Sequence, residues 1–454
     1  MKKIVLSGFV LMFLSIGGVG MFTRSTVACT NQNISSCGEG KFVSDSSKTI
    51  WVPDNFTSIQ EAVNNASIGY TIFIRADTYH ENVILNKPNL TLIGENKHTT
   101  VIDGNGKTVV SIKANNTKIE GFTLQNGRFG IVMNPWTHGH IISNNVILNN
   151  DYGVSGHYDC VNVSICDNTI TSNNIAGIIM LFSHSVISDN LISDNGKAEY
   201  KEYGSGIQIW RGSNSKVIYC VNNTICGNTI RNHQIGICPI HYSEGNLFLH
   251  NNFVNNTKQF PVPTTVWNNT IIENYWSDYN GTDLYNSPNQ NETGSDGIGD
   301  IPYVISGKNQ DVHPLMGAFS DFPVTHKQET YHVTTICNST ISEFQFNYIA
   351  KTISFNVTGP DYSLGFCRVS VPNIIIQDLW QGNYTVLIDE EQPLTIRNWT
   401  DVKYTYIYFT YLHSAHKVEM ISEFPTWKLM LLTLIELTVA IAIYKRRLLK
   451  TPIH

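Results

Sequence analysis

Short aliphatic motifs recur along the central part of the chain at a nearly constant spacing. Six-residue motifs begin at Ile142, Ile165, Ile187, Ile225 and Leu249, and an earlier copy begins at Ile119, so the steps are 23, 23, 22, 38 and 24 residues. A period of about 22–24 residues is typical of one coil of a parallel β-helix or of one leucine-rich repeat. Because the motifs are β-branched, rich in asparagine and without a leucine consensus, they predict an all-β fold whose main domain is a right-handed parallel β-helix.

The register of the motifs predicts which side chains face the core. The aliphatic first and last positions are expected to point inward, and asparagine shares the fourth position of successive motifs. Since stacked coils lie about 4.8 Å apart, these amides are expected to form a hydrogen-bonded ladder at a turn. The set is Asn145, Asn168, Asn190, Asn228 and Asn252. A glycine followed by an aliphatic residue recurs midway between motifs and is expected to begin a second strand after a tight bend: Gly130, Gly153, Gly177, Gly206 and Gly236.

The segments that flank the repeats predict the domain organisation. The β-helix is expected to span residues 48–317, and a short amphipathic helix near residues 57–63, with a capping box from Thr57 to Gln60, is expected to close its N-terminal end. Residues 325–421 lack the repeat and contain short alternating strands at close spacing, which predict a β-sandwich spacer domain.

Both ends of the chain carry apolar segments. Residues 1–28 combine two lysines, an apolar run and small residues, which predicts a secretory signal peptide, with an uncleaved anchor as the alternative. Residues 427–445 predict a transmembrane helix, and the basic tail 446–454 predicts a cytoplasmic C-terminus. We therefore expect a single-pass protein on the extracellular face of the cell membrane. Residues 423–426 (EFPT) resemble the C-terminal sorting signals of archaeal surface proteins, in which case the helix would be replaced by a lipid.

Composition narrows the classes of function. Charged residues make up 15% of the chain and the net charge is -6, without a basic patch suited to nucleic acid, so that partner class is set aside. Acceptor sites for N-glycosylation are spread from Asn33 to Asn398, which fits a glycosylated exterior. No GxSxG, P-loop, dinucleotide-binding or CxxC motif is present.

Nine cysteines fit an oxidising compartment. Local disulfides are expected within two short segments, Cys160 with Cys166 and Cys220 with Cys226. Pairs of Cys337 with Cys367 and of Cys29 with Cys37 would complete the set and leave Cys238 over, although sequence alone does not fix the connectivity.

Aromatic and basic side chains recur a few residues beyond each glycine and suggest a binding face. A row of flat rings suits stacking on sugar rings, while histidine and arginine can hydrogen-bond the hydroxyl groups. The alternative is packing of loops against the outer wall of the β-helix. The pairs are Trp136 with His138, His157 with Tyr158, Phe182 with His184, Trp210 with Arg211, and His241 with Tyr242.

Asp167 and Asp189 occupy the same motif position in adjacent coils and form a candidate catalytic pair. Their Cα atoms are expected about 4.8 Å apart, and like charges at that distance raise one pKa or bind a cation. Glycosidases use paired carboxylates at comparable separations. The alternative is a solvated turn in which aspartate serves as the turn former.

Two sets of side chains are candidate metal ligands. Methionine and histidine are copper ligands, and the copper candidates are Met133, His138, His140 and Met180, with His157 and His184 nearby in the repeat. Alternating aspartate and glycine can wrap calcium, and the calcium candidates are Asp278, Asp283, Asp296 and Asp300, with Asx turns as the alternative.

Two flanking blocks make the likeness to a known family specific. Residues 58–104 (SIQEAVNNASIGYTIFIRADTYHENVIL…LTLIGENKHTTVIDG) closely resemble the opening of NosD-type β-helix proteins, in the pectin-lyase-like superfamily. Residues 274–316 (NYWSDYNGTD…DGIGDIPYVI…NQDVHPLM) resemble the segment that ends that domain, so the resemblance covers roughly residues 50–317. The sandwich resembles juxtamembrane domains of archaeal surface proteins.

The resemblance implies three functions in decreasing order of fit. The superfamily includes carbohydrate-binding proteins, which fits a surface protein that binds extracellular polysaccharide. It also includes sugar lyases and hydrolases, which would use Asp167 and Asp189. The family is described as periplasmic copper-binding, and its founding members assist copper-site assembly in nitrous oxide reductase, which implies a copper accessory role.

Overall fold

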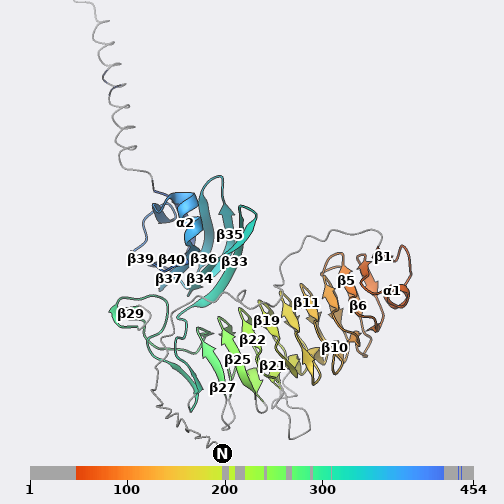
Figure 1. Cartoon of the computed structure of the whole chain (residues 1–454). Helices are drawn as coiled ribbons and strands as arrows, with labels where there is room; N and C mark the ends of the chain where they lie inside the picture. The colour runs from red at the N-terminus through yellow and green to blue at the C-terminus, as the bar shows by residue number, and fades with distance from the viewer. Residues whose placement is uncertain are drawn as a thin grey trace, which may run out of the picture.

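The computed structural model describes residues 48–196, 204–209, 220–239, 243–261, 268–286, 290–307 and 309–423, together with Thr438 and Ile441. The expected signal peptide, the basic tail and nearly all of the expected transmembrane segment lie outside these ranges. Within the described part, a parallel β-helix is followed by a β-sandwich (Figure 1).

Three parallel sheets form the right-handed β-helix, and most coils contribute one strand to each sheet. Sheet A contains β1 (Thr49–Val52), β2 (Thr71–Ile74), β5 (Thr91–Gly94), β8 (Lys118–Glu120), β11 (Ile141–Ser143), β15 (Ser164–Cys166), β19 (Val186–Ser188), β22 (Thr224–Cys226), β25 (Glu244–Leu249) and β27 (Asn268–Ile272). Sheet B contains β3 (Asp77–Tyr79), β6 (Thr100–Asp103), β9 (Thr123–Gln125), β12 (Val146–Leu148), β16 (Thr169–Thr171), β20 (Leu191–Ser193), β23 (Thr229–Arg231), β26 (Asn252–Val254) and β28 (Tyr275–Trp276). Sheet C contains β4 (Val83–Leu85), β7 (Val110–Ile112), β10 (Phe129–Met133), β13 (Tyr152–Ser155), β17 (Ala176–Met180), β21 (Ser205–Ile209) and β24 (Ile235–Pro239).

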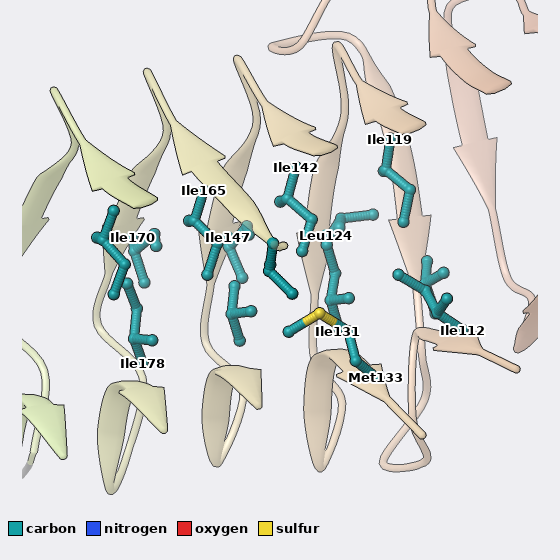
Figure 2. Packing of buried hydrophobic residues seen from close by; sticks show 14 of the residues in the cluster. Ile112, Ile119, Leu124, Ile131, Met133, Ile142, Ile147, Ile165, Ile170 and Ile178 are labelled. Atoms are coloured by element: carbon teal, nitrogen blue, oxygen red, sulfur yellow. The ribbon is translucent and has the colours of Figure 1, made fainter. Parts of the chain in front are cut away.

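The recurrent aliphatic residues stack inside the coils, as the repeat predicts. Ile142 pairs with Ile119 on one side and with Ile165 on the other, and all three side chains are fully buried. Figure 2 shows this row facing the aliphatic side chains of the other two sheets across the interior. Gly130 lies in sheet C, where a Cβ atom would approach Ile147 and the carbonyl oxygen of Gly153, so the tight packing between coils explains this glycine.

A ladder of buried asparagines runs along the turn between sheets A and B. The Oδ1 atom of Asn228 accepts hydrogen bonds from the backbone N–H and the Nδ2 of Asn190, at 3.1 and 2.9 Å. Asn251 rather than Asn252 continues the ladder, because Phe248 rather than Leu249 pairs with Ile225. The predicted fourth position was therefore wrong by one residue in that coil. The ladder is Asn145, Asn168, Asn190, Asn228, Asn251 and Asn274.

Two further ladders lie at the other turns and were not predicted. One contains Asn150, Asn173 and Asn195 and then continues through His233 to Asn256. The other runs from Ser185 through Asn223 and Asn246 to Asn269. All three ladders supply hydrogen-bond partners to backbone groups that the turns bury.

The helix α1 (Ile59–Asn65) covers the N-terminal end of the β-helix, as predicted. Its N-cap is Ser58, which accepts a hydrogen bond from the backbone N–H of Glu61, so the predicted capping box from Thr57 to Gln60 is wrong. Glu81 accepts from the backbone N–H groups of Ile59 and Gln60, which places a carboxylate at the positive end of the helix.

Short antiparallel pairs follow the last coil, and the sandwich begins directly after them. The pairs are β29 (Tyr285–Asn286) with β30 (Glu292–Thr293) and β31 (Tyr303–Ser306) with β32 (Asn309–Asp311). One sheet of the sandwich contains β33 (Ala318–His326), β34 (Glu329–Cys337), β37 (Leu364–Pro372), β40 (Tyr404–Leu412) and β39 (Thr395–Thr400). The other contains β35 (Thr340–Asn347), β36 (Thr352–Thr358), β41 (Ala415–Ser422) and β38 (Tyr384–Ile388), and α2 (Asn373–Trp380) packs beside them.

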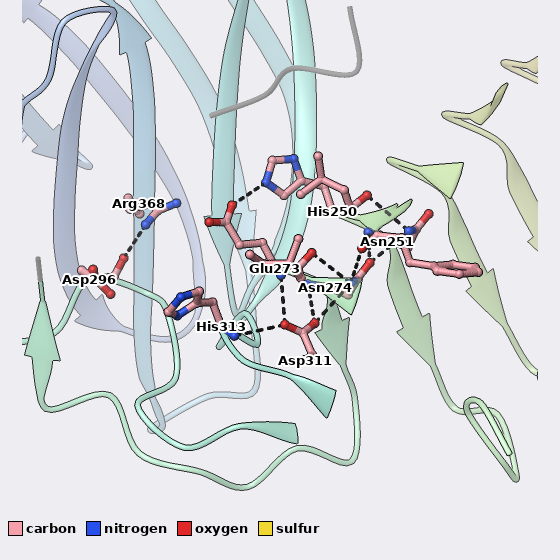
Figure 3. A network of polar contacts seen from close by, with 11 residues as sticks. His250, Asn251, Glu273, Asn274, Asp296, Asp311, His313 and Arg368 are labelled. Carbon is pink, nitrogen blue, oxygen red and sulfur yellow. Dashed lines mark hydrogen bonds and ion pairs between the residues drawn. The ribbon is translucent and has the colours of Figure 1, made fainter. Parts of the chain in front are cut away.

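Asp311 ends the ladder between sheets A and B. Its carboxylate is fully buried and accepts hydrogen bonds from the backbone N–H groups of Glu273, Asn274 and His313, from the Asn274 amide and from Trp276 Nε1 (Figure 3). The segment that resembles the end of a NosD-type domain therefore has a structural role, because it closes an open row of buried polar groups.

The sandwich contacts the same end of the β-helix. The Asn252 side chain exchanges two hydrogen bonds of 2.8 Å with the backbone of Phe319, and the rings of His250 and Phe319 stack with centroids 4.0 Å apart. Arg368 donates to the carbonyl oxygen of Asp296 at 3.0 Å. These contacts join the two domains.

Candidate functional site

An exposed aromatic cluster lies on the loops that connect sheet C to sheet A. The rings of Trp136 and Tyr158 meet edge to face with centroids 5.5 Å apart, and His157 lies 6.0 Å from Tyr158. Trp136 is 69% exposed, although tryptophan is usually well buried. The structure thus brings together these three residues of the predicted stripe.

The backbone of Trp136 adopts an unusual conformation. Its φ angle is 60°, in the left-handed region that bulky residues seldom occupy. The neighbouring Thr137 is buried and donates a hydrogen bond to the carbonyl oxygen of Asn134 at 2.7 Å, which fixes the turn. The loop therefore holds the indole ring outward at a conformational cost of about 1–3 kcal/mol, and such strain is concentrated at functional sites.

A second aromatic pair, half-buried on the outside of sheet C, was missed in the sequence. Phe129 and Tyr152 are paired in adjacent coils, and their rings stack with centroids 5.2 Å apart. The guanidinium of Arg128 lies 5.4 Å from the centre of the Phe129 ring. A signal was available, since an aromatic residue directly precedes the recurrent glycine in both coils.

Other members of the predicted stripe lie elsewhere. Phe182 is fully buried in the core, where it pairs with Cys160, so its place in the stripe was wrong. His184 is exposed but lies on a turn with a φ of 53°. Trp210, Arg211, His241 and Tyr242 lie outside the described residues.

Asp167 and Asp189 lie one coil apart on the turn between sheets A and B. Cys166 pairs with Ser188, which confirms that the two aspartates share a register position. Loss of hydration in the folded chain, together with the negative charge of the Asp167 carboxylate, raises the pKa of Asp189 to about 7. Both side chains remain accessible to solvent. Asp321 and His332 of the sandwich influence the same carboxylate, so this pair faces the second domain.

The raised pKa predicts a dependence of stability on pH. Because Asp189 binds its proton more tightly in the folded chain, the folded state loses stability as pH rises from about 4 to about 7. Solvent screening should limit the effect to about 1 kcal/mol. Urea denaturation across this pH range should show a shallower loss for Asp189→Asn than for the wild type. Identical slopes in the two proteins would contradict this prediction, and Asp167→Asn should lie between them.

The copper candidates do not form a site. Met133 and Met180 are fully buried in the core, and the ring of Phe182 lies against Gly156 in the coil between them. His140 is buried, with its Nδ1 atom 2.9 Å from the Thr117 hydroxyl group, and burial lowers its pKa to about 4. His138 is on the neighbouring outer turn. The described residues contain no group of three or more His, Cys, Asp or Glu side chains that could hold a metal ion.

The calcium candidates are used as hydrogen-bond acceptors instead. Asp283 accepts from the backbone N–H groups of Asp296 and Gly297, and burial raises its pKa to about 7. Asp300 accepts from the backbone of Leu284, and Asp278 accepts from the Tyr303 hydroxyl group. The carboxylates of Asp296 and Asp300 contribute to the raised pKa of Asp283, and the four side chains do not make up a group that could hold a metal ion among the described residues.

The predicted local disulfides are wrong. The thiol of Cys160 donates to the carbonyl oxygen of Asn134, and the thiol of Cys220 donates to that of Met180. Cys166 and Cys226 are disulfide-bonded residues on the outer side of sheet A, whereas Cys160 and Cys220 point into the core. The two members of each predicted pair are six residues apart along the coil, so they lie on different walls of the β-helix. Cys337 and Cys367 lie directly opposite each other as thiols.

Comparisons with known proteins show which family and which relatives the β-helix is similar to. Residues 63–281 match the family model described as periplasmic copper-binding protein (NosD). A cell surface glycoprotein of Methanothermus fervidus is 38% identical over 104 residues, which is 22% of this chain and 17% of the relative. A probable ABC transporter binding protein NosD of Stutzerimonas stutzeri is 32% identical over 134 residues, which is 28% of each chain. The chain therefore spans less than a third of the length of these relatives.

Solved structures with some likeness include polysaccharide-modifying enzymes. An alginate lyase from Paenibacillus has a TM-score of 0.36 and 14% identity, covering 51% of this chain and 77% of that one. A pectin methylesterase from carrot has a TM-score of 0.35 and 15% identity, covering 50% and 80%. At these TM-scores the likenesses carry no argument about function.

The fold and the ladders define a solenoid protein, in which repeated coils build a right-handed parallel β-helix. The match over residues 63–281 supports a β-helix of the NosD type, and the relatives support an extracellular or periplasmic location. None of the helices among the described residues is long and apolar enough to cross a membrane.

Proposed function

We propose that this surface protein binds extracellular polysaccharide through the aromatic cluster of Trp136, Tyr158 and His157. The observation that carries the proposal is the exposed indole ring of Trp136, held outward by a strained backbone. The face of an aromatic ring packs well against the apolar face of a sugar ring, and the imidazole can hydrogen-bond the hydroxyl groups.

The second aromatic pair extends the proposed site along the coils. Phe129 and Tyr152 lie at the start of the strands whose far ends lead into the loops of Trp136 and Tyr158. A strand of five residues is about 16 Å long, so two ring platforms at that separation suit a chain of several sugars. Arg128 beside Phe129 favours a polymer that carries acidic groups.

A second candidate function is cleavage of a glycan by Asp167 and Asp189. The specific observation in its favour is the pKa of about 7 for Asp189 beside another carboxylate. A carboxylic acid that is still protonated near neutral pH can donate its proton to the leaving-group oxygen. The pair lies between sheets A and B, however, while the aromatic cluster lies between sheets C and A. Binding without cleavage therefore describes the aromatic cluster better.

The proposed location is the cell surface, with residues 427–445 as the membrane anchor. The relative named cell surface glycoprotein and the predicted sequons support this location. In that arrangement the sandwich would lie between the anchor and the β-helix.

Affinity electrophoresis tests the proposed binding. The purified protein should migrate more slowly through gels that contain the right polysaccharide, with alginate and pectin as acidic polymers and xylan as a neutral one. Trp136→Ala should lower the apparent affinity by about two- to tenfold, because a stacking contact contributes about 0.5–1.5 kcal/mol. Tyr362→Ala is the matched control, since Tyr362 is 95% exposed on the sandwich. Equal retardation of wild type and Trp136→Ala would reject the site.

A further inference from the structure

Cys337 and Cys367 are in direct register on the neighbouring antiparallel strands β34 and β37. The backbone N–H of Asn338 donates to the carbonyl oxygen of Phe366, so the next residue pair along the ladder is a hydrogen-bonded pair. Cys337 and Cys367 therefore form a non-hydrogen-bonded pair, in which side chains approach most closely and Cα atoms lie about 4.5 Å apart. That spacing falls within the range of about 4.4–6.8 Å found in disulfides.

The two thiols are buried and differ in their surroundings. Cys337 and Cys367 are 2% and 0% exposed. Burial raises the pKa of the Cys367 thiol well above its ordinary value. Burial opposes ionisation of Cys337 too, but hydrogen bonds from Cys367, Tyr411 and Ser339 lower its pKa overall. In the folded sandwich Cys337 is thus the thiol of the pair that ionises more readily.

A chain of hydrogen bonds leads away from Cys337. The Tyr411 hydroxyl group lies 3.5 Å from the Cys337 sulfur and 2.6 Å from the Ser339 hydroxyl group. Ser339 is 2.7 Å from Nε2 of His413, whose Nδ1 is 2.6 Å from the Ser363 hydroxyl group. In the folded sandwich this chain of hydrogen bonds fixes the position of the Cys337 thiol beside Cys367.

We propose that Cys337 and Cys367 are an oxidisable pair that forms a cross-strand disulfide in the exported protein. The thiolate of Cys337 attacks one sulfur of a disulfide-bearing oxidant, forming a mixed disulfide and releasing one thiol. The thiolate of Cys367 then attacks the Cys337 sulfur, which forms the cross-strand bond and releases the second thiol. Two electrons pass to the oxidant, and both protons end on its thiols. Since the pair is buried, the exchange takes place before the sandwich has closed around it.

The bond would stabilise the part of the sandwich that contacts the β-helix. Arg368 follows Cys367 directly and donates a hydrogen bond to the carbonyl oxygen of Asp296. Joining residues 337 and 367 closes a loop of about thirty residues, a length at which a disulfide typically stabilises a fold substantially. This inference rests on an extracytoplasmic location and does not depend on glycan binding.

Alkylation and peptide mapping test the proposal. The full chain is isolated from its native compartment without reductant, then denatured in iodoacetamide and digested. We expect the peptides of Cys337 and Cys367 to be recovered linked and unalkylated, and to become alkylated after reduction. Cys238 is the internal control, because it is a buried thiol with no disulfide and should be alkylated without reduction. Full alkylation of Cys337 and Cys367 before reduction would overturn the proposal.

Thermal unfolding provides an independent measurement. Cys337→Ser should lower the unfolding midpoint of the oxidised chain by about 10 °C or more. Reductant should lower the wild-type midpoint by more than it lowers that of Cys337→Ser, in which only the disulfide-bonded Cys166 and Cys226 can still respond. Cys238→Ser should leave the reductant-induced shift unchanged. A wild-type midpoint that does not respond to reductant after complete reduction would count against a stabilising bond.

Discussion

Replacing Asp311 with alanine should lower the free energy of unfolding by about 3–5 kcal/mol. The Asp311 carboxylate is the common acceptor for five N–H donors at the last turn of the ladder, at distances from 2.9 to 3.2 Å. Alanine would leave these buried donors without an acceptor, and each such group is costly. Burial raises the pKa of Asp311, so the folded wild type binds a proton there more tightly than the unfolded chain does, and the loss in the alanine variant should be larger at acidic pH.

Urea denaturation followed by circular dichroism measures this loss. Asp311→Asn should be intermediate, because one amide oxygen can still accept part of the network. Asp361→Ala is the matched control, since Asp361 is exposed on the sandwich. An unfolding midpoint for Asp311→Ala equal to that of the control would show that the carboxylate does not cap the ladder.

The second large effect is expected for Asn228→Ala, in the middle of the same ladder. The amide of Asn228 donates to the carbonyl oxygens of Ile187 and Cys226 and to Asn251, and it accepts two bonds from Asn190. Removing the amide should destabilise the chain by about 3–4 kcal/mol, because the partners in both adjacent coils lose buried hydrogen bonds.

Hydrogen exchange adds a spatial readout to this variant. Backbone amides of the coils on both sides of Asn228 should exchange faster, whereas those near α1 should be unaffected, because each coil contacts only its neighbours. Asn280→Ala is the control for an exposed asparagine. If Asn228→Ala exchanged no faster than this control, the ladder would have no energetic role.

The β-helix was predictable because its coils repeat the same physical requirement. Each coil needs inward aliphatic residues and a polar group that satisfies the turn, and these recur at Ile142, Ile165 and Ile187. The register failed where the type of residue changed, since Phe248 occupies a position that is aliphatic in the other coils. His233 similarly replaces asparagine in the second ladder, which hid that ladder from a search for one motif.

The candidate site was less predictable because its loops differ in length. Trp136 is the sixth residue after Gly130, but His157 is the fourth residue after Gly153. Counting from the glycine therefore does not give the same structural position in each loop. Phe182 was placed outside by this count and lies in the core. The metal candidates failed for a related reason, since spacing along a coil does not say whether a side chain points inward. Asp311 carries little local signal, because all of its partners except the backbone of His313 precede it by more than thirty residues.

Hydroxyl-radical footprinting of the aromatic cluster tests the central claim most directly. The protein is exposed to radicals with and without the polysaccharide that retards it most, and oxidation of single peptides is measured by mass spectrometry. We predict that the polymer protects Trp136 and Tyr158 severalfold, while oxidation of Tyr362 on the sandwich is unchanged. Equal oxidation of Trp136 and Tyr158 with and without bound polymer would show that glycan binding, if present, lies elsewhere on the molecule.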